Sequence, residues 1–94
     1  MMKVSVKFYA HLRDLVDRKS KIEFDFKEGA TISHLLDELF LDSKIKKHLS
    51  DEHGHLNSDI TILRNGREIK FLNGIETLLE SGDEISIFPL VAGG

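Results

Sequence analysis

The residues with the clearest chemical use in this sequence are the last two, Gly93 and Gly94. A C-terminal α-carboxylate has a pKa of about 3.3–3.7, so it is ionised at neutral pH and is a poor electrophile until another group activates it. Because glycine lacks a Cβ atom, a diglycine end can enter a slot that is too narrow for any other residue. The pair therefore suits a carboxylate that is presented to the active site of another protein.

The residues before the diglycine predict a tail. Phe88 ends a predicted strand, and Pro89 follows it. Because proline cannot donate to a strand ladder, we expect the strand to stop there and residues 89–94 to form a flexible C-terminal tail. In extended form these residues span roughly 20 Å at about 3.3–3.6 Å each. That length is enough to carry the carboxylate across the surface of a partner into a buried pocket.

A second candidate is the pair His53 and His55 beside Asp51 and Glu52, which could be read as a metal site. Two histidines two residues apart in a loop lack the helical spacing and the supporting hydrogen bonds of a metal centre, so we expect a solvated loop. The chain has no cysteine, no recognisable nucleophile motif and no phosphate-binding glycine loop. We therefore expect no metal and no bound cofactor.

Size and composition limit the function classes. The 94 residues, 40% of them hydrophobic, suit one globular domain spanning 1–94. The net charge of −3 argues against a nucleic-acid-binding protein, which normally carries a basic excess. No apolar run is long enough to cross a membrane, and the N-terminus lacks the apolar run of a signal peptide. We expect a cytoplasmic protein without a nucleic-acid or membrane partner.

The first half of the chain indicates two strands and a helix that would position the tail. Alternating apolar residues predict strands at 4–8 and 22–26, joined as an antiparallel, hairpin-like pair. Between them, 10–16 reads as a short helical turn. Thr31 stands where an N-cap would, before apolar residues at helical spacing from Ile32 to Phe40, which predict the main helix.

The second half is punctuated by turn signals. The Asn65-Gly66 pair predicts a hairpin turn, because both residue types tolerate a positive φ. Before this turn we expect a short helix at 43–49, an exposed loop at 50–58 and a strand at 60–63. After it we expect a returning strand at Glu68-Ile69-Lys70, a helical turn at Leu78-Leu79 near Glu76, a turn at Gly82-Asp83, and a last strand with Ile85, Ile87 and Phe88.

These elements predict an α+β roll. The first and last strands are more apolar than an edge strand usually is, so we place them side by side and parallel at the centre of the sheet. The helix and the intervening strands then provide the long connection that parallel neighbours require. The predicted domain is a mixed sheet of four to five strands with one main helix packed across one face.

With these elements in place, the sequence resembles the ubiquitin-like β-grasp sulfur carriers, and among them the small subunit of molybdopterin synthase. The resemblance rests on the Asn65-Gly66 hairpin and on three segments, which are Lys7-Phe8-Tyr9-Ala10-His11-Leu12-Arg13-Asp14-Leu15, Leu79-Glu80-Ser81-Gly82-Asp83-Glu84-Ile85 and Phe88-Pro89-Leu90-Val91-Ala92-Gly93-Gly94. It is most specific in the last of these, and residues 41–58 look longer than the usual connection in this family.

The resemblance implies a role for each residue of the tail. The carboxylate of Gly94 would be adenylated by an E1-like enzyme that uses ATP, and then converted to a thiocarboxylate. Gly93 would allow passage into the active sites. The segment that threads into the partner would consist of Pro89, Leu90, Val91 and Ala92. The sulfur would pass to a pterin precursor held by the large subunit of molybdopterin synthase, and the chain itself would be a non-catalytic carrier.

Three aromatic residues are the expected docking anchors on the apolar sheet surface near the tail: Tyr9, Phe71 and Phe88. The alternative is that they belong to the core. Two other functions also fit the sequence. The chain could be a ubiquitin-like modifier whose Gly94 is joined to lysines of target proteins, or an adaptor that does not use its tail. The segment from Phe8 to Leu15 favours the sulfur carrier over the modifier.

Overall fold

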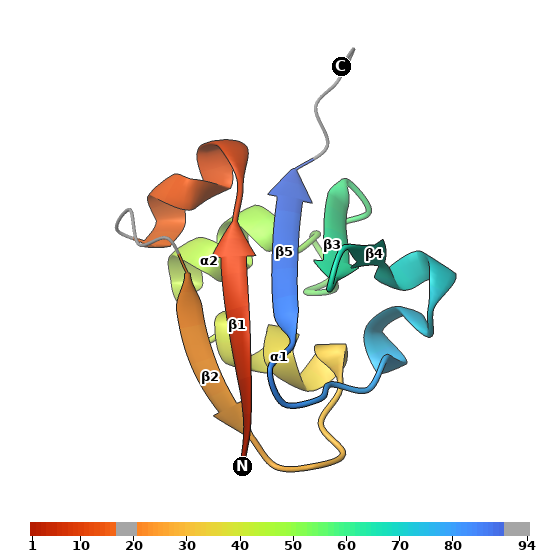
Figure 1. The fold of residues 1–94 in the computed structure, drawn as a ribbon. Helices are drawn as coiled ribbons and strands as arrows, with labels where there is room; N and C mark the ends of the chain where they lie inside the picture. Colours follow the sequence, from red (N-terminus) through yellow and green to blue (C-terminus); the bar gives the residue numbers. More distant parts are fainter. Residues whose placement is uncertain (17–20, 90–94) are drawn as a thin grey trace.

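The computed structural model describes residues 1–16 and 21–89, and within them a single mixed sheet forms the framework (Figure 1). Its strand order is β2-β1-β5-β3-β4. The strands are β1 (Met2–Phe8), β2 (Ile22–Phe26), β3 (Ile60–Arg64), β4 (Arg67–Glu68) and β5 (Glu84–Pro89). As predicted, β1 and β5 are parallel neighbours at the centre, and β2 pairs antiparallel with β1.

Alternation of side chains gives the sheet one apolar face. Val4, Val6 and Phe8 of β1 are buried, whereas the residues between them are half-buried or exposed. Two helices lie on the same side of the sheet, α1 (Ile32–Leu39) and α2 (Ser43–Leu49). Their buried residues join those of β1, β3 and β5 in one core. The predicted main helix is confirmed, and α2 confirms the short helix expected at 43–49.

The predicted N-cap of α1 is confirmed, with histidine in place of the glutamate or glutamine usual in a capping box. The backbone N–H of Thr31 donates to Nδ1 of His34 over 2.9 Å. The neighbouring backbone also ties the start of α1 to the segment before β5, because Ile32 donates to the carbonyl of Thr77 and Leu79 donates to that of Ala30. The helix is thereby fixed at its first turn.

Two of the predicted local structures are wrong. The returning strand is only Arg67–Glu68, and the next residues form the short 3₁₀ helix η2 (Ile69–Phe71), because the chain turns there to bury Ile69. The helical turn predicted at Leu78-Leu79 lies earlier, as the 3₁₀ helix η3 (Gly74–Glu76). Leu78 instead forms an isolated bridge with Thr31.

The helical turn at 10–16 and the hairpin turn agree with the structure, whereas the end of the last strand does not. The helical turn at 10–16 is the 3₁₀ helix η1 (Ala10–Val16). Asn65 and Gly66 have φ values of 50° and 85°, the left-handed conformation that a tight hairpin turn requires. The predicted end of the last strand at Phe88 is wrong by one residue, because Pro89 is the last residue of β5 and pairs with Ile60. Residues 90–94 lie outside the described part of the chain.

Candidate functional site

The described part of the candidate site is β5 and its surroundings, because β5 leads directly to the C-terminal residues. This strand is held on both sides, by the parallel strand β1 and by the antiparallel strand β3 (Figure 1). The predicted site residues Leu90, Val91, Ala92, Gly93 and Gly94 lie outside the described residues. The described part of the site is therefore β5, from which these residues continue, together with the side chains around it.

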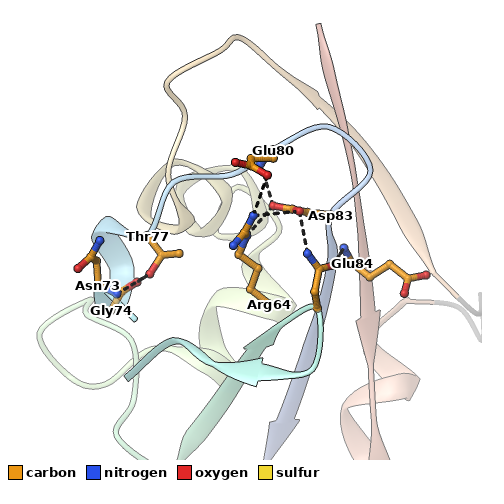
Figure 2. A network of polar contacts seen from close by, with 8 residues as sticks. Arg64, Asn73, Gly74, Thr77, Glu80, Asp83 and Glu84 are labelled. Carbon is orange, nitrogen blue, oxygen red and sulfur yellow. Dashed lines mark hydrogen bonds and ion pairs between the residues drawn. The ribbon is translucent and has the colours of Figure 1, made fainter. Parts of the chain in front are cut away.

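A polar network anchors the beginning of β5 (Figure 2). Asp83, whose side chain is only 4% exposed, accepts two hydrogen bonds from Arg64, from Nε over 2.7 Å and from Nη2 over 3.3 Å. The side chain of Asn65 donates to Asp83 over 2.9 Å, and the backbone N–H of Glu80 donates over 2.8 Å. One carboxylate thus joins the turn before β5 to the β3–β4 hairpin.

The ionisation of this network follows from its contacts. Burial raises the pKa of Asp83, but the hydrogen bonds from Arg64, from the Glu80 amide and from Asn65 outweigh burial and leave the pKa of Asp83 below its ordinary value. The hydrogen bond to Asp83 raises the pKa of Arg64. Both groups are therefore charged at neutral pH, and the pair is a bidentate ion pair with defined geometry.

A second cluster lies near the end of β5, on the sheet face opposite α1. The rings of Tyr9 and Phe88 are stacked, with centroids 4.3 Å apart and an interplanar angle of 12°. Nζ of Lys7 lies 5.4 Å from the centroid of the Tyr9 ring. Both aromatic residues are half-buried, so each keeps an accessible surface. We call Lys7, Tyr9 and Phe88 the aromatic patch.

The third predicted anchor, Phe71, is in a different place. It lies on η2, beyond edge strand β4, whereas β5 is in the middle of the sheet (Figure 1). Its side chain is 83% exposed, so it is not part of the core. The structure therefore brings Tyr9 and Phe88 together one residue before the end of β5, and it does not bring Phe71 to them.

Two contributors to the site were missed by the sequence reasoning. The sequence predicts a turn at Gly82-Asp83 within a segment that carries the family resemblance, but it does not indicate that Asp83 holds the start of β5. Its partner Arg64 is 19 residues away in the chain, so no local pattern could reveal the pair. Lys7 belongs to a segment that carries the family resemblance, but the sequence does not indicate its position over the Tyr9 ring.

The loop with His53 and His55 is organised by hydrogen bonds to Asp51. Oδ1 of Asp51 accepts from the backbone N–H of His53 over 2.8 Å and from that of His55 over 3.0 Å. Among residues 1–16 and 21–89, no group of three or more histidine, cysteine, aspartate or glutamate side chains is placed to hold a metal ion. The same residues contain no helix that is long and apolar enough to span a membrane.

The strand order, the helix across one face and the anchored C-terminal strand define a ubiquitin-like β-grasp domain, as predicted. The model of the ThiS family matches residues 6–94, so the chain belongs to this family of ubiquitin-like sulfur carriers. The match extends through the diglycine end and covers both clusters around β5.

Individual relatives differ in their named roles. The chain is 34% identical over 93 residues to small archaeal modifier protein 3 of Haloferax volcanii, with 99% of this chain and 100% of that one covered. It is 26% identical over 94 residues to the molybdopterin synthase sulfur carrier subunit of Mycobacterium tuberculosis, with 100% of each chain covered. It also resembles a chain in the solved BexX/CysO complex of Amycolatopsis orientalis, with 28% identity, a TM-score of 0.75, and 97% of this chain and 99% of that one covered.

Proposed function

We propose that the chain carries sulfur as a thiocarboxylate on Gly94 and donates it in molybdopterin biosynthesis as the small subunit of a synthase. The observation that carries this proposal is the match to the ThiS family, which runs through Gly94. The relative from Mycobacterium tuberculosis, which is named as a molybdopterin synthase sulfur carrier subunit, supports the destination of the sulfur.

The proposed chemistry takes place on one carboxylate. An oxygen of the Gly94 carboxylate attacks the α-phosphate of ATP in the active site of an E1-like enzyme, and pyrophosphate leaves. A sulfide nucleophile then attacks the activated carbonyl carbon and AMP leaves, so sulfur replaces one oxygen. In the large synthase subunit this sulfur attacks a carbon of the pterin precursor and displaces an oxygen leaving group from that carbon. Water then hydrolyses the resulting thioester, so the sulfur stays on the pterin and the carrier is released with its carboxylate restored. The chain binds no cofactor of its own, and ATP is used by the activating enzyme.

The structure supports this role through the direction of β5. The Asp83 network holds the first residues of β5, and pairing with β1 and β3 holds the rest of the strand. Pro89 therefore has a defined position from which the C-terminal residues continue. We propose that the aromatic patch docks on the partner while Leu90, Val91 and Ala92 enter its channel. Stacked aromatic residues beside an extended segment are suitable anchors for such an interface.

The second candidate is a protein modifier whose Gly94 forms an isopeptide bond with lysines of target proteins. The similarity to small archaeal modifier protein 3, at 34% identity over nearly the whole chain, favours it specifically. Both candidates begin with the same acyl-adenylate. They differ in the nucleophile that displaces AMP, which is sulfur for the carrier and a lysine amine for the modifier.

Reconstitution tests the first step that the two candidates share. The full chain is incubated with an E1-like enzyme from the same host, magnesium and ATP, and exchange between ATP and pyrophosphate is measured. We expect exchange with the full chain and none with a chain that lacks Gly93 and Gly94. Exchange that does not depend on these two residues would contradict the proposal.

A further inference from the structure

Two of the three asparagines in the chain are followed by glycine, in the pairs Asn65-Gly66 and Asn73-Gly74. In such a pair the backbone nitrogen of glycine can attack the side-chain carbonyl carbon of asparagine, because no Cβ atom shields this nitrogen. Asparagine is accordingly one of the thermolabile residues of proteins. The two pairs have the same local chemistry, so a difference between their reactivities must come from the fold.

The reaction is deamidation, and its only other reactant is water. A bond forms between the glycine nitrogen and Cγ of asparagine, the glycine N–H loses its proton, and the side-chain nitrogen leaves as ammonia. Water then opens the resulting succinimide ring at either carbonyl, which gives aspartate or isoaspartate. In isoaspartate the main chain runs through the side-chain carbon and is longer by one methylene group. Each product carries a new carboxylate and adds about 1 Da.

The side-chain amide of Asn65 is held at both of its polar atoms. Its Nδ2 donates to the buried carboxylate of Asp83 over 2.9 Å, and its Oδ1 accepts from the backbone N–H of Glu84 over 2.9 Å. Attack by Gly66 requires this amide to rotate out of both contacts. Loss of a hydrogen bond to a charged group alone disfavours the rotated conformer by about tenfold or more.

The side-chain amide of Asn73 is not held in this way. Asn73 precedes the 3₁₀ helix η3 but makes no side-chain capping bond to it, and it lies apart from the Asp83 network (Figure 2). Its backbone N–H donates to Oγ1 of Thr77 over 3.0 Å, whereas its side chain has no hydrogen-bond partner among residues 1–16 and 21–89. Only the three-residue turn η3 resists rotation here, and the hydrogen bonds of such turns have poor geometry.

We propose that Asn73-Gly74 is a site of spontaneous deamidation in the folded chain, and that the Asp83 network protects Asn65-Gly66 from the same reaction. Both asparagines are exposed, so access of water does not separate them. The hydrogen bonds of the side-chain amide do. The inference does not rest on the proposed function, because neither the C-terminal residues nor a partner takes part.

Isoaspartate at position 73 would act on the start of α1 through Thr77. This residue is 5% exposed, its side chain accepts from the backbone of Asn73, and its carbonyl accepts from the backbone N–H of Ile32 over 3.0 Å. An added methylene group at position 73 displaces the first contact, so we expect faster hydrogen exchange at the Ile32 amide. Aspartate leaves the main chain unchanged and should not have this effect.

The first test compares the two pairs within one molecule. The full chain is incubated at mildly alkaline pH, once folded and once in urea, and peptide mapping by mass spectrometry gives the deamidation rate at each asparagine. We expect Asn73 to react at least about tenfold faster than Asn65 in the folded chain, and the two to react equally in urea. Equal rates in the folded chain, a faster Asn65, or a difference that persists in urea would overturn the proposal.

Two variants test the protecting network, under conditions where circular dichroism shows both to be folded. Asp83→Ala removes the acceptor of the Asn65 amide, and Leu49→Ala on α2 controls for the loss of stability. We expect the first variant to accelerate deamidation at Asn65 about tenfold over the control, with equal rates at Asn73. Equal Asn65 rates in both variants would overturn the protection, and an isoaspartate form that exchanges at Ile32 as slowly as Asn73→Asp would overturn the effect on α1.

Discussion

The substitution Asp83→Asn tests the idea that one buried carboxylate sets the position of β5. The asparagine has nearly the same shape, but it removes the charge that Arg64 contacts through two nitrogen atoms. Breaking a buried pair by removing one partner costs about 3–5 kcal/mol. Arg64 is 21% exposed and has Glu80 at 3.4 Å as a second partner, so we expect about 2–3 kcal/mol. This corresponds to a fall in Tm of roughly 10–20 °C for a domain of this size.

The assay is urea unfolding followed by circular dichroism, with Asp59→Asn at an exposed position as the matched control. The pH dependence provides a second test. Because the pKa of Asp83 is lowered in the folded state, its contribution is fully present above the unfolded pKa of about 3.9 and is lost as the pH falls through the folded value. The difference between wild type and Asp83→Asn should therefore shrink below about pH 4. A difference under about 0.5 kcal/mol at pH 7, within the range of ordinary surface substitutions, would refute the reasoning.

Three further predictions concern the tail, the helix cap and the docking surface. Deletion of Gly93 and Gly94 should abolish adenylation and leave the urea midpoint unchanged, because both residues follow the last strand; a shifted midpoint would show that they contribute to folding. His34→Ala should destabilise the protein by about 1 kcal/mol in the same assay, whereas His34→Gln should not, because glutamine can complete the capping box; equal effects would exclude the cap. Phe88→Ala should weaken capture of the large synthase subunit in a pull-down more than Phe71→Ala does, with stability checked for both; the reverse order would place the interface at η2.

The arrangement of the sheet could be predicted because its signals are local and strong. Alternating apolar residues in β1 and β5 indicated two central strands, and Asn65-Gly66 and Thr31 marked a turn and a helix start. The errors came where one pattern fits two structures. Glu68-Ile69-Lys70 alternates as a strand does, yet a 3₁₀ turn also buries Ile69.

The candidate site was only partly predictable, because its parts come together in space. Tyr9 and Phe88 were identified as exposed aromatics, but their stacking depends on the parallel pairing of β1 and β5. The Asp83 network depends on Arg64, which lies on a different strand. The three aromatic candidates were equivalent in sequence, and only the fold separated Phe71 from the other two.

The most direct test of the central claim is the intact mass of this chain isolated from its own host. Replacement of one oxygen of the Gly94 carboxylate by sulfur adds about 16 Da, and fragmentation assigns the added mass to the last residue. We predict a thiocarboxylated population with this mass on Gly94, and its loss after incubation with the large synthase subunit and the pterin precursor. Only the unmodified mass, or Gly94 found solely in isopeptide bonds to lysine, would contradict the sulfur-carrier account.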